Sequence, residues 1–205
     1  MAELSVSLRK APQVLSLDPR YLGDVLEDIR RVGRATGTEE LAESITAGMQ
    51  ARIAAVVAKA SLASTRPRVL QLEWADPLMC GGHWVAEMVE MAGGVNCFGD
   101  KEHGSSRLEW PEVVASQPEV VMLMPCGFDL KRAIEDVPLL TEEEGWDLLP
   151  AVRNNRVYVI DAGAYTSRLG PRLVAGLEIM AEIIHPKLFC GVMPEGSAVR
   201  LGDLA

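Results

Sequence analysis

The sequence predicts an α/β fold in which a mostly parallel sheet is covered by helices on both faces, preceded by one long helix and a short strand–helix unit. Three observations support this prediction. From about residue 65 onward, short apolar runs alternate with segments of helical periodicity, one of these runs is apolar throughout, and a long uninterrupted helical pattern precedes them. The 205 residues, 48% hydrophobic and 24% charged, are typical of a globular chain with its own core.

Residues 1–37 are expected to form the short strand–helix unit. The apolar run at 13–17, Gln-Val-Leu-Ser-Leu, predicts a strand that ends at an Asp-Pro turn. Apolar residues at helical spacing then predict a helix over 21–35, and Gly37 favours the end of that helix.

One strand and one helix cannot enclose a core by themselves. We therefore expect this unit to dock on the larger lobe, to complete a sheet in a partner, or to belong to a longer fold. Self-association through the apolar face of residues 22–32 is one way in which a second chain covers it.

A long helix is predicted over residues 38–63. Thr38 is a suitable N-cap, and Glu39 and Glu40 follow it at the positive end of the helix dipole. The segment to about Ser61 is rich in alanine and contains no proline, so it spans roughly 35 Å at about 1.5 Å per residue. This length is about the width of a small domain.

Residues 64–205 are predicted to form the α/β lobe. The run at 119–124, Glu-Val-Val-Met-Leu-Met, indicates a strand buried on both faces. The last twenty residues contain prolines and glycines and are expected to form a loosely packed tail. The expected strands cover 69–72, 95–98, 119–124 and 156–160, and the expected helices cover 83–92, 110–116, 128–137 and 170–185.

Charge and motif content exclude several classes of function. The 20 basic and 29 acidic residues give a net charge of −9, which repels a phosphate backbone and excludes a nucleic-acid partner. The four cysteines show no CxxC spacing, so neither a disulfide framework nor a zinc site is indicated. The signatures GxGxxG, P-loop, HExxH and GxSxG do not occur. We expect a protein that is not an enzyme and has no cofactor or bound metal.

Ligands of open α/β sheets bind beyond the carboxyl ends of the strands. That rule selects four loops, at 18–21, 74–84, 125–128 and 161–168. Together these loops hold two Trp, two Tyr, one Phe, two Arg and one His. Such a set favours a large, partly aromatic or amphipathic ligand, because flat rings stack and the polar groups anchor it.

Each of these residues also has a purely structural interpretation. Trp84, at the start of a helix, is more often a packing residue than a ligand platform. Cys126 with His83 as its base is a candidate nucleophile for a hydrolase or transferase, but a small buried filler beside Gly127 is the favoured interpretation. Cys80 and His83 are spaced for a shared soft metal, which is a weak pattern with only two ligands.

Several runs of the sequence together resemble a known family. They are GTEELAESITAGMQARI, GGHWVAEMVEMAGGVNCFG, WPEVVASQPEVVMLMPCGFD and LPAVRNNRVYVIDAGAYTSRLGPRLVAGLEIMAEIIHP. They are similar to the helical-backbone (class III) substrate-binding proteins of ABC importers for vitamin B12 and iron siderophores, and most similar to the cobalamin-binding branch. The resemblance covers about 140 residues.

The resemblance implies a division of the chain into three parts. Residues 64–205 correspond to a Rossmann-like C-terminal lobe, residues 38–63 to the spine helix that joins two lobes, and residues 1–37 to a remnant of an N-terminal lobe. It also implies a non-enzymatic importer component, or a truncated form of one, that binds cobalamin or a related corrinoid between the lobes and docks to the transmembrane permease subunits.

The resemblance also implies roles for single residues. An aromatic residue at Trp84 contacts the corrin, and Glu90, six residues later, forms salt bridges with permease arginines from the outer end of the same helix. Further contacts are expected from His83, Phe128, Tyr165, Arg168 and Tyr21.

Two further expectations follow from the same family. A ferric siderophore or haem is the alternative ligand, for which Arg20, Tyr21, Tyr165 and Arg168 supply polar contacts. The family works in the periplasm or outside the cell at a membrane, whereas the N-terminus here, MAELSVSLRKAPQVLSLDP, lacks the apolar core of a signal peptide.

Overall fold

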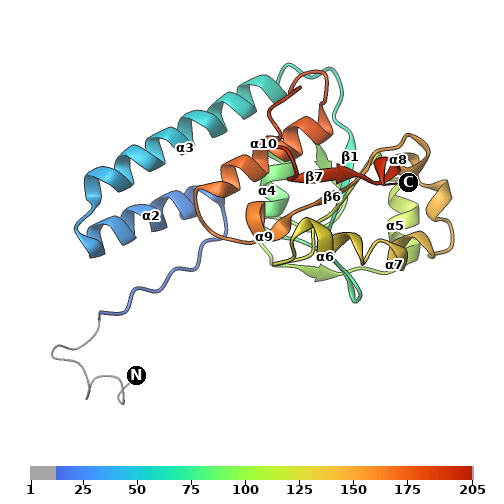
Figure 1. The fold of residues 1–205 in the computed structure, drawn as a ribbon, viewed down its shortest axis with the longest axis horizontal. Coiled ribbons are helices and arrows are strands. Elements are labelled where there is room, and N and C mark those ends of the chain that lie inside the picture. The colour runs from blue at the N-terminus through green and yellow to red at the C-terminus, as the bar shows by residue number, and fades with distance from the viewer. Residues whose placement is uncertain (1–12, 205) are drawn as a thin grey trace, which may run out of the picture.

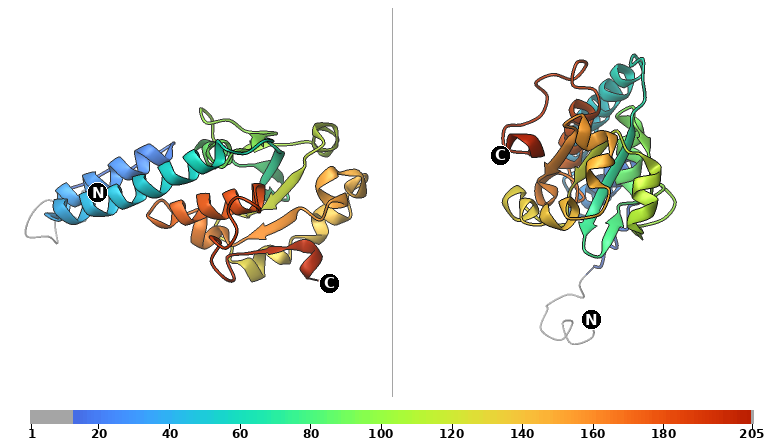
Figure 2. Two further views of the ribbon diagram at one scale, coloured as in Figure 1. Left: turned by 90° about the horizontal axis from the view of Figure 1, so that it is seen from above. Right: turned by 90° about the vertical axis from the view of Figure 1, so that its right-hand side faces the viewer.

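The computed structural model describes residues 13–204, which form an α/β lobe with two long antiparallel helices packed along one side (Figure 1). The two helices, α2 (Leu22–Thr36) and α3 (Glu39–Ala60), project beyond the lobe (Figure 2). The remaining helices are α4 (His83–Met91), α5 (Trp110–Ser116), α6 (Leu130–Ile134), α7 (Pro138–Thr141), α8 (Pro150–Arg153), α9 (Ala162–Tyr165) and α10 (Arg172–Ile184), with the short 3-10 helices η1 (Trp146–Leu148) and η2 (Leu201–Asp203).

The sheet has a parallel centre and antiparallel edges. Its strand order is β4-β2-β1-β5-β6-β7, with β3 paired to β1. The pairs β1–β3, β1–β5 and β5–β6 are parallel, whereas the pairs β1–β2, β2–β4 and β6–β7 are antiparallel. The strands are β1 (Arg68–Ala75), β2 (Leu78–Cys80), β3 (Val95–Asn96), β4 (Ser106–Arg107), β5 (Val120–Leu123), β6 (Val157–Ile160) and β7 (Ala198–Arg200).

Alternate residues of the central strand β5 serve two separate cores. Val120 and Met122 face the side covered by α3, α4 and α10, while Val121 and Leu123 face the side covered by α5, α7 and η1. All four residues are buried, as the continuous apolar run predicts. The predicted α/β fold with helices on both faces is therefore confirmed.

The helix α2 docks on the rest of the chain, which is one of the three arrangements expected for the N-terminal unit. Leu22, Val25 and Leu26 are buried against α3, α10 and their neighbours. The backbone N–H of Leu22 also donates to the carboxylate of Glu87 on α4, at 2.7 Å. The apolar stripe, for which cover by a second chain was one of the alternatives, is thus largely covered within this chain.

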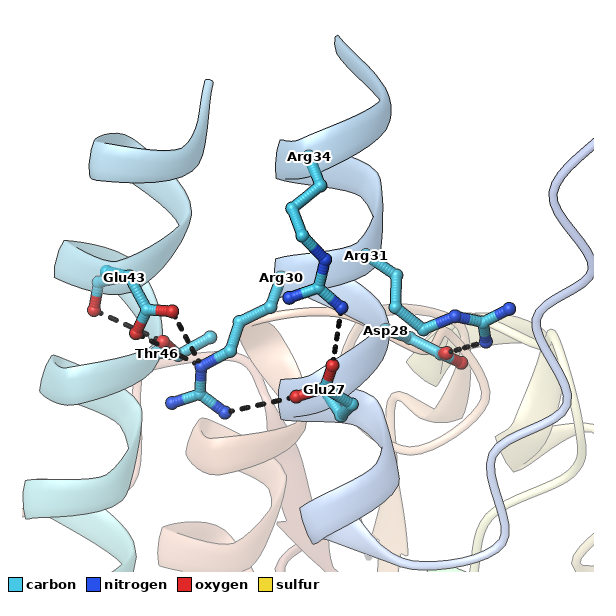
Figure 3. A network of polar contacts seen from close by, with 7 residues as sticks. All are labelled: Glu27, Asp28, Arg30, Arg31, Arg34, Glu43 and Thr46. Carbon is cyan, nitrogen blue, oxygen red and sulfur yellow. Dashed lines mark hydrogen bonds and ion pairs between the residues drawn. The ribbon is translucent and has the colours of Figure 1, made fainter. Parts of the chain in front are cut away.

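Ion pairs tie the outer halves of α2 and α3 together (Figure 3). Arg30 on α2 reaches Glu43 on α3, with 3.1 Å between Nε and Oε2, and also lies near Glu27. The hydrogen bond from Arg34 lowers the pKa of Glu27. These groups are solvent-exposed, so the pairs fix the pairing of the helices more than they add stability.

Two predictions at the ends of the chain are wrong. Residues 13–17 are extended but form no strand, because no neighbouring strand pairs with them among the described residues. The C-terminal tail is ordered: β7 pairs antiparallel with β6, and Phe189 is buried in the core. Residues 13–17 have the apolar composition of a strand but no neighbouring strand to pair with. Residues 198–200 lack that composition but pair with β6.

The helix predicted over 128–137 is also shorter in the structure. Asp129 caps α6 by accepting the backbone N–H of Arg132 at 2.8 Å, so the helix begins at Leu130. It ends at Ile134, and Pro138 begins the separate helix α7. Among residues 13–204, no helix combines the length and the apolar composition that crossing a bilayer requires.

Candidate functional site

The carboxyl ends of β1, β5 and β6 lie on one edge of the sheet, and the loops that follow them are bonded into one surface. We call this surface the carboxyl edge. Hydrogen bonds among these loops and the end of β1 fix their relative positions, so side chains on them are presented by a rigid support. The bonds run from Cys126 N–H to Glu73 O (3.2 Å), from Gly163 N–H to Phe128 O (2.7 Å) and from Gly127 N–H to Ser167 Oγ (3.0 Å).

One aromatic cluster stands at the ends of β1 and β5. Trp74 and Phe128 meet edge to face, with ring centroids 5.3 Å apart and an interplanar angle of 87°. The guanidinium of Arg132 lies 4.4 Å from the Phe128 centroid. Both rings are half-buried, so each still presents apolar surface to solvent. Phe128 was predicted as a contact residue, and Trp74 joins it although it was not singled out.

A second cluster surrounds His83 at the start of α4. The imidazole of His83 stacks on the indole of Trp84, with centroids 6.2 Å apart and planes 28° apart. Its backbone has a φ of 49°, in the left-handed region, and its N–H donates to the carbonyl oxygens of Asp100 (3.0 Å) and His103 (3.1 Å). The loop of residues 99–105 therefore holds His83 in place.

Trp84 combines the structural and the functional interpretations. Its indole N–H donates to the carbonyl oxygen of Thr166 at 2.9 Å, and its ring packs against the core formed by α4 and α10. The side chain is half-buried rather than enclosed. It thus links α4 to the loop after β6 and still offers part of its surface at the carboxyl edge.

Tyr21 reaches the same loop from the opposite direction. It is the N-cap residue of α2, and its hydroxyl bonds to Glu102, which raises the pKa of the tyrosine. The structure therefore brings Tyr21 and His83 to residues 99–105, and Trp84 lies beside His83.

The other predicted contacts occupy less central positions. Tyr165 is half-buried and packs against the core, and its carbonyl oxygen lies so near Gly176 that a side chain there would collide with it. Arg168 is exposed and makes no hydrogen bond or ion pair within residues 13–204. Arg168 is thus free to meet an anionic group.

Glu90 lies on the outer surface of α4, as expected for a docking residue. Its Oε2 is 2.8 Å from Nζ of Lys101, and the two side chains are 45% and 42% exposed. The hydrogen bond from Lys101 to Glu90 raises the pKa of the lysine. A docking partner must therefore displace an exposed and weak intramolecular pair.

The proposed cysteine chemistry finds little geometric support. No hydrogen bond joins Cys126 to His83 in the described part of the chain, and His83 instead contacts Trp84 and the 99–105 loop. Cys80 is buried, with its Sγ 3.1 Å from Ser106 Oγ. Residues 13–204 contain no group of three or more His, Cys, Asp or Glu side chains placed to hold a metal ion.

Hollows elsewhere on the molecule do not include the aromatic clusters. Five of them measure about 210 to 530 Å³, and none of these five is lined by Trp74, Trp84 or Phe128. The largest lies between the ends of α3 and α4 and includes Glu90. None of these five hollows therefore lies over the aromatic clusters of the carboxyl edge.

Sequence reasoning missed the 99–105 loop. Asp100 accepts the backbone N–H groups of Glu102 and His103, both at 2.7 Å, and this turn directs the carbonyl groups that hold His83. The pattern Asp-x-Glu-His-Gly is a recognisable turn sequence. The sequence does not reveal that this turn binds His83, because the groups that accept from His83 are backbone carbonyl oxygens, which every residue type has.

Comparisons with known proteins agree with this architecture. The family described as "Periplasmic binding protein" matches residues 2–164. The uncharacterized ABC transporter substrate-binding lipoprotein YvrC of Bacillus subtilis (strain 168) is 25% identical over 174 residues, which are 84% of this chain and 53% of that protein. The chain thus spans about half the length of the curated relative that it matches.

Solved structures show the same fold. The periplasmic heme-binding protein RhuT of Roseiflexus sp. RS-1 is 26% identical with a TM-score of 0.69, over 82% of this chain and 65% of that one. The periplasmic vitamin B12 binding protein BtuF of Vibrio cholerae is 18% identical with a TM-score of 0.68, over 89% of this chain and 69% of that one. Because the family match covers more than half of the sequence, this chain belongs to the periplasmic binding protein family.

Proposed function

We propose that this chain acts in an ABC importer as a substrate-binding component, and that its cargo is cobalamin or a related corrinoid held at the carboxyl edge. The observation that carries the proposal is the set of half-buried rings there, Trp74, Phe128, His83 and Trp84. Half-buried rings on a fixed support bind a flat macrocycle by stacking and by burial of apolar surface. The fold match to a vitamin B12 binding protein supports the same ligand class.

Haem or a ferric siderophore is a second candidate, favoured by the exposed Arg168. A guanidinium with no hydrogen-bond or ion-pair partner between residues 13 and 204 suits the carboxylates of haem or the acidic groups of a siderophore. The similarity to the heme-binding protein supports haem to the same degree as the similarity to the vitamin B12 binding protein supports cobalamin.

A ligand panel distinguishes the candidates. Calorimetric titration of the intact chain with cyanocobalamin, haem and a ferric catecholate complex is expected to give saturable heat with cyanocobalamin. Saturation by haem or the catecholate alone would transfer the proposal to the second candidate. Absence of saturable heat with all three would contradict a binding role for this face.

Docking is assigned in the same proposal to Glu90. Its carboxylate is exposed on α4. On docking, its ion pair with Lys101 breaks and it pairs with an arginine of a permease subunit instead. This partner places the chain outside the cytoplasmic membrane, and the related Bacillus subtilis protein is named a lipoprotein. The division into residues 1–37, 38–63 and 64–205, with a ligand cleft between two lobes, belongs to this proposal too.

A further inference from the structure

We propose that His83 coordinates the metal ion at the centre of the bound macrocycle, so that its Nε2 replaces a water molecule on the cobalt of an aquated corrinoid. The inference rests on the proposed function, since it concerns the same ligand on the same face. It adds a direct bond between a protein side chain and the metal of the cargo. That bond makes His83 a residue that selects the ligation state of the corrinoid.

The first argument is that His83 differs from the other two histidines of the chain. His103 bonds through Nδ1 to the carboxylate of Asp100 at 2.9 Å, and His185 is buried with Nε2 3.2 Å from the carbonyl oxygen of Gly93. Neither ring nitrogen of His83 has a hydrogen-bond partner among residues 13–204. Its imidazole is therefore available as a ligand, and neutral imidazole is a common donor to transition metals.

The second argument is that the ring of His83 is held in place by contacts that leave one nitrogen open. One face stacks on Trp84, and the backbone N–H is fixed by the carbonyl groups of Asp100 and His103. A methyl group placed on Gly104 would lie 3.4 Å from Cε1 and 4.0 Å from Nδ1 of the ring. Gly104 thus lies beside the Cε1–Nδ1 edge of the ring, and Nε2 is more than 4 Å from the added methyl group.

The third argument is backbone strain. A φ of 49° is uncommon for residues other than glycine, and it is maintained here by two hydrogen bonds that the His83 N–H donates to carbonyl oxygens of the 99–105 loop. Gly82, immediately before it, allows the loop to approach so closely that a side chain at this position would collide with His103 O. The hydrogen bonds to the loop and the close approach at Gly82 therefore fix the backbone of His83.

The chemical step is a ligand substitution. The cobalt–oxygen bond to water breaks, a bond from Nε2 to cobalt forms, and water leaves with no change in oxidation state. A corrinoid whose upper position holds cyanide has no labile water there, so it binds by stacking alone. Comparing the aquated and the cyanated corrinoid thus distinguishes coordination of the cobalt by His83 from binding of the macrocycle by stacking.

The test compares aquacobalamin with cyanocobalamin on the intact chain, by calorimetry and by absorption spectroscopy. We expect the aquated form to bind at least about ten-fold more tightly and to change its visible spectrum on binding, whereas the cyanated form binds without such a change. His83→Asn removes the donor and tolerates the left-handed backbone, so it is expected to abolish the spectral change and the affinity advantage of the aquated form over the cyanated form. His103→Asn is the matched control and is expected to retain both differences.

The outcomes separate the two proposals. If both forms bind equally, with no spectral change, coordination by His83 is overturned and the corrinoid-binding role stands. If His83→Asn retains the spectral change, the donor is another group and the inference is equally overturned. If neither form binds to a chain whose circular dichroism shows the native fold, the proposed function fails and the inference fails with it.

Discussion

The helical side of the molecule and the carboxyl edge use their polar side chains in opposite ways. On the helical side, Arg52 of α3 donates two hydrogen bonds, of 2.9 and 2.6 Å, to the carboxylate of Glu178 on α10. Arg30 of α2 forms an ion pair with Glu43 of α3. At the carboxyl edge, the ring of His83 and the guanidinium of Arg168 have no such partners within the described range 13–204. Charges on the first surface hold helices together. At the carboxyl edge Arg132 pairs with the nearby Asp136, with 2.6 Å between Nη1 and Oδ1, but His83 and Arg168 have no comparable partner within residues 13–204.

The two regions also differ in what buries their apolar side chains. Leu177 of α10 and Val25 of α2 are almost fully enclosed, whereas Trp74, Phe128 and Trp84 remain half-buried. An aromatic ring that stays partly exposed on a rigid loop contributes less to folding than an enclosed one. The comparison therefore predicts that stability depends on the helical side and that binding depends on the carboxyl edge.

The largest effect on stability is expected from Leu177→Ala. Leu177 is 0% exposed in the core between α10 and the sheet, so truncation leaves a cavity and lowers the free energy of unfolding by about 2–5 kcal/mol. Leu62→Ala, at a side chain that is 75% exposed, is the control and should change it by less than about 0.5 kcal/mol. Urea denaturation measures both. Equal effects of the two substitutions would break the comparison.

A substitution at Gly82 is expected to act on both properties. The new methyl group would collide with the carbonyl oxygen of His103 and lie 2.6 Å from that of Gly104, so the 99–105 loop must move. We expect Gly82→Ala to cost about 1–3 kcal/mol of stability and to weaken corrinoid binding, because His83 loses its support. Gly23→Ala on α2 is the matched control, since nothing lies within 4 Å of the added group. Unchanged binding by Gly82→Ala would show that the loop does not shape the site.

The smallest effect is expected in the pH dependence of stability. Burial raises the pKa of Glu87, and the hydrogen bond from Leu22 N–H only partly opposes it. The folded state therefore keeps a proton that the unfolded state has already lost, in the range just above the ordinary value of 4.5. This contribution to stability is lost as the pH rises through that range.

Glu87→Gln tests this sign. Its amide oxygen still accepts from Leu22, but it does not titrate, so the variant should lose less stability than the wild type between pH 4.5 and neutral. Urea denaturation at several pH values measures the difference, and Glu40→Gln on the exposed face of α3 is the control. A steeper loss in Glu87→Gln would reverse the assignment of burial as the dominant cause.

The centre of the fold could be predicted from the sequence because its strands are apolar runs. β5 and β6 are buried throughout, and buried strands are apolar at every position. The edge strands could not be predicted, since β2 and β7 are short, half-buried and held by their partners. The strand predicted at 13–17 does not form although the run is apolar, because a strand requires a neighbouring strand and the local sequence does not reveal one.

The candidate site was predictable as far as strand ends determine it. The rule that ligands bind beyond the ends of parallel strands selected the segments that contain His83, Trp84 and Phe128, although the antiparallel strand β2 separates His83 and Trp84 from the end of β1. The support of His83 by residues 99–105 and the meeting of Trp74 with Phe128 depend on tertiary contacts between segments. Side-chain chemistry is thus readable from sequence, whereas the backbone groups that orient it are not.

Two tryptophans of this chain allow the most direct test of a binding role for the carboxyl edge. Trp84 and Trp110 each stack on a neighbouring ring at 6.2 Å and each donate one hydrogen bond to a backbone carbonyl, at 2.9 and 2.8 Å, but only Trp84 lies at the carboxyl edge. Calorimetric titration with cyanocobalamin is expected to show binding at least about ten-fold weaker in Trp84→Phe and unchanged in Trp110→Phe. Equal affinity of both variants and the wild type would contradict the account.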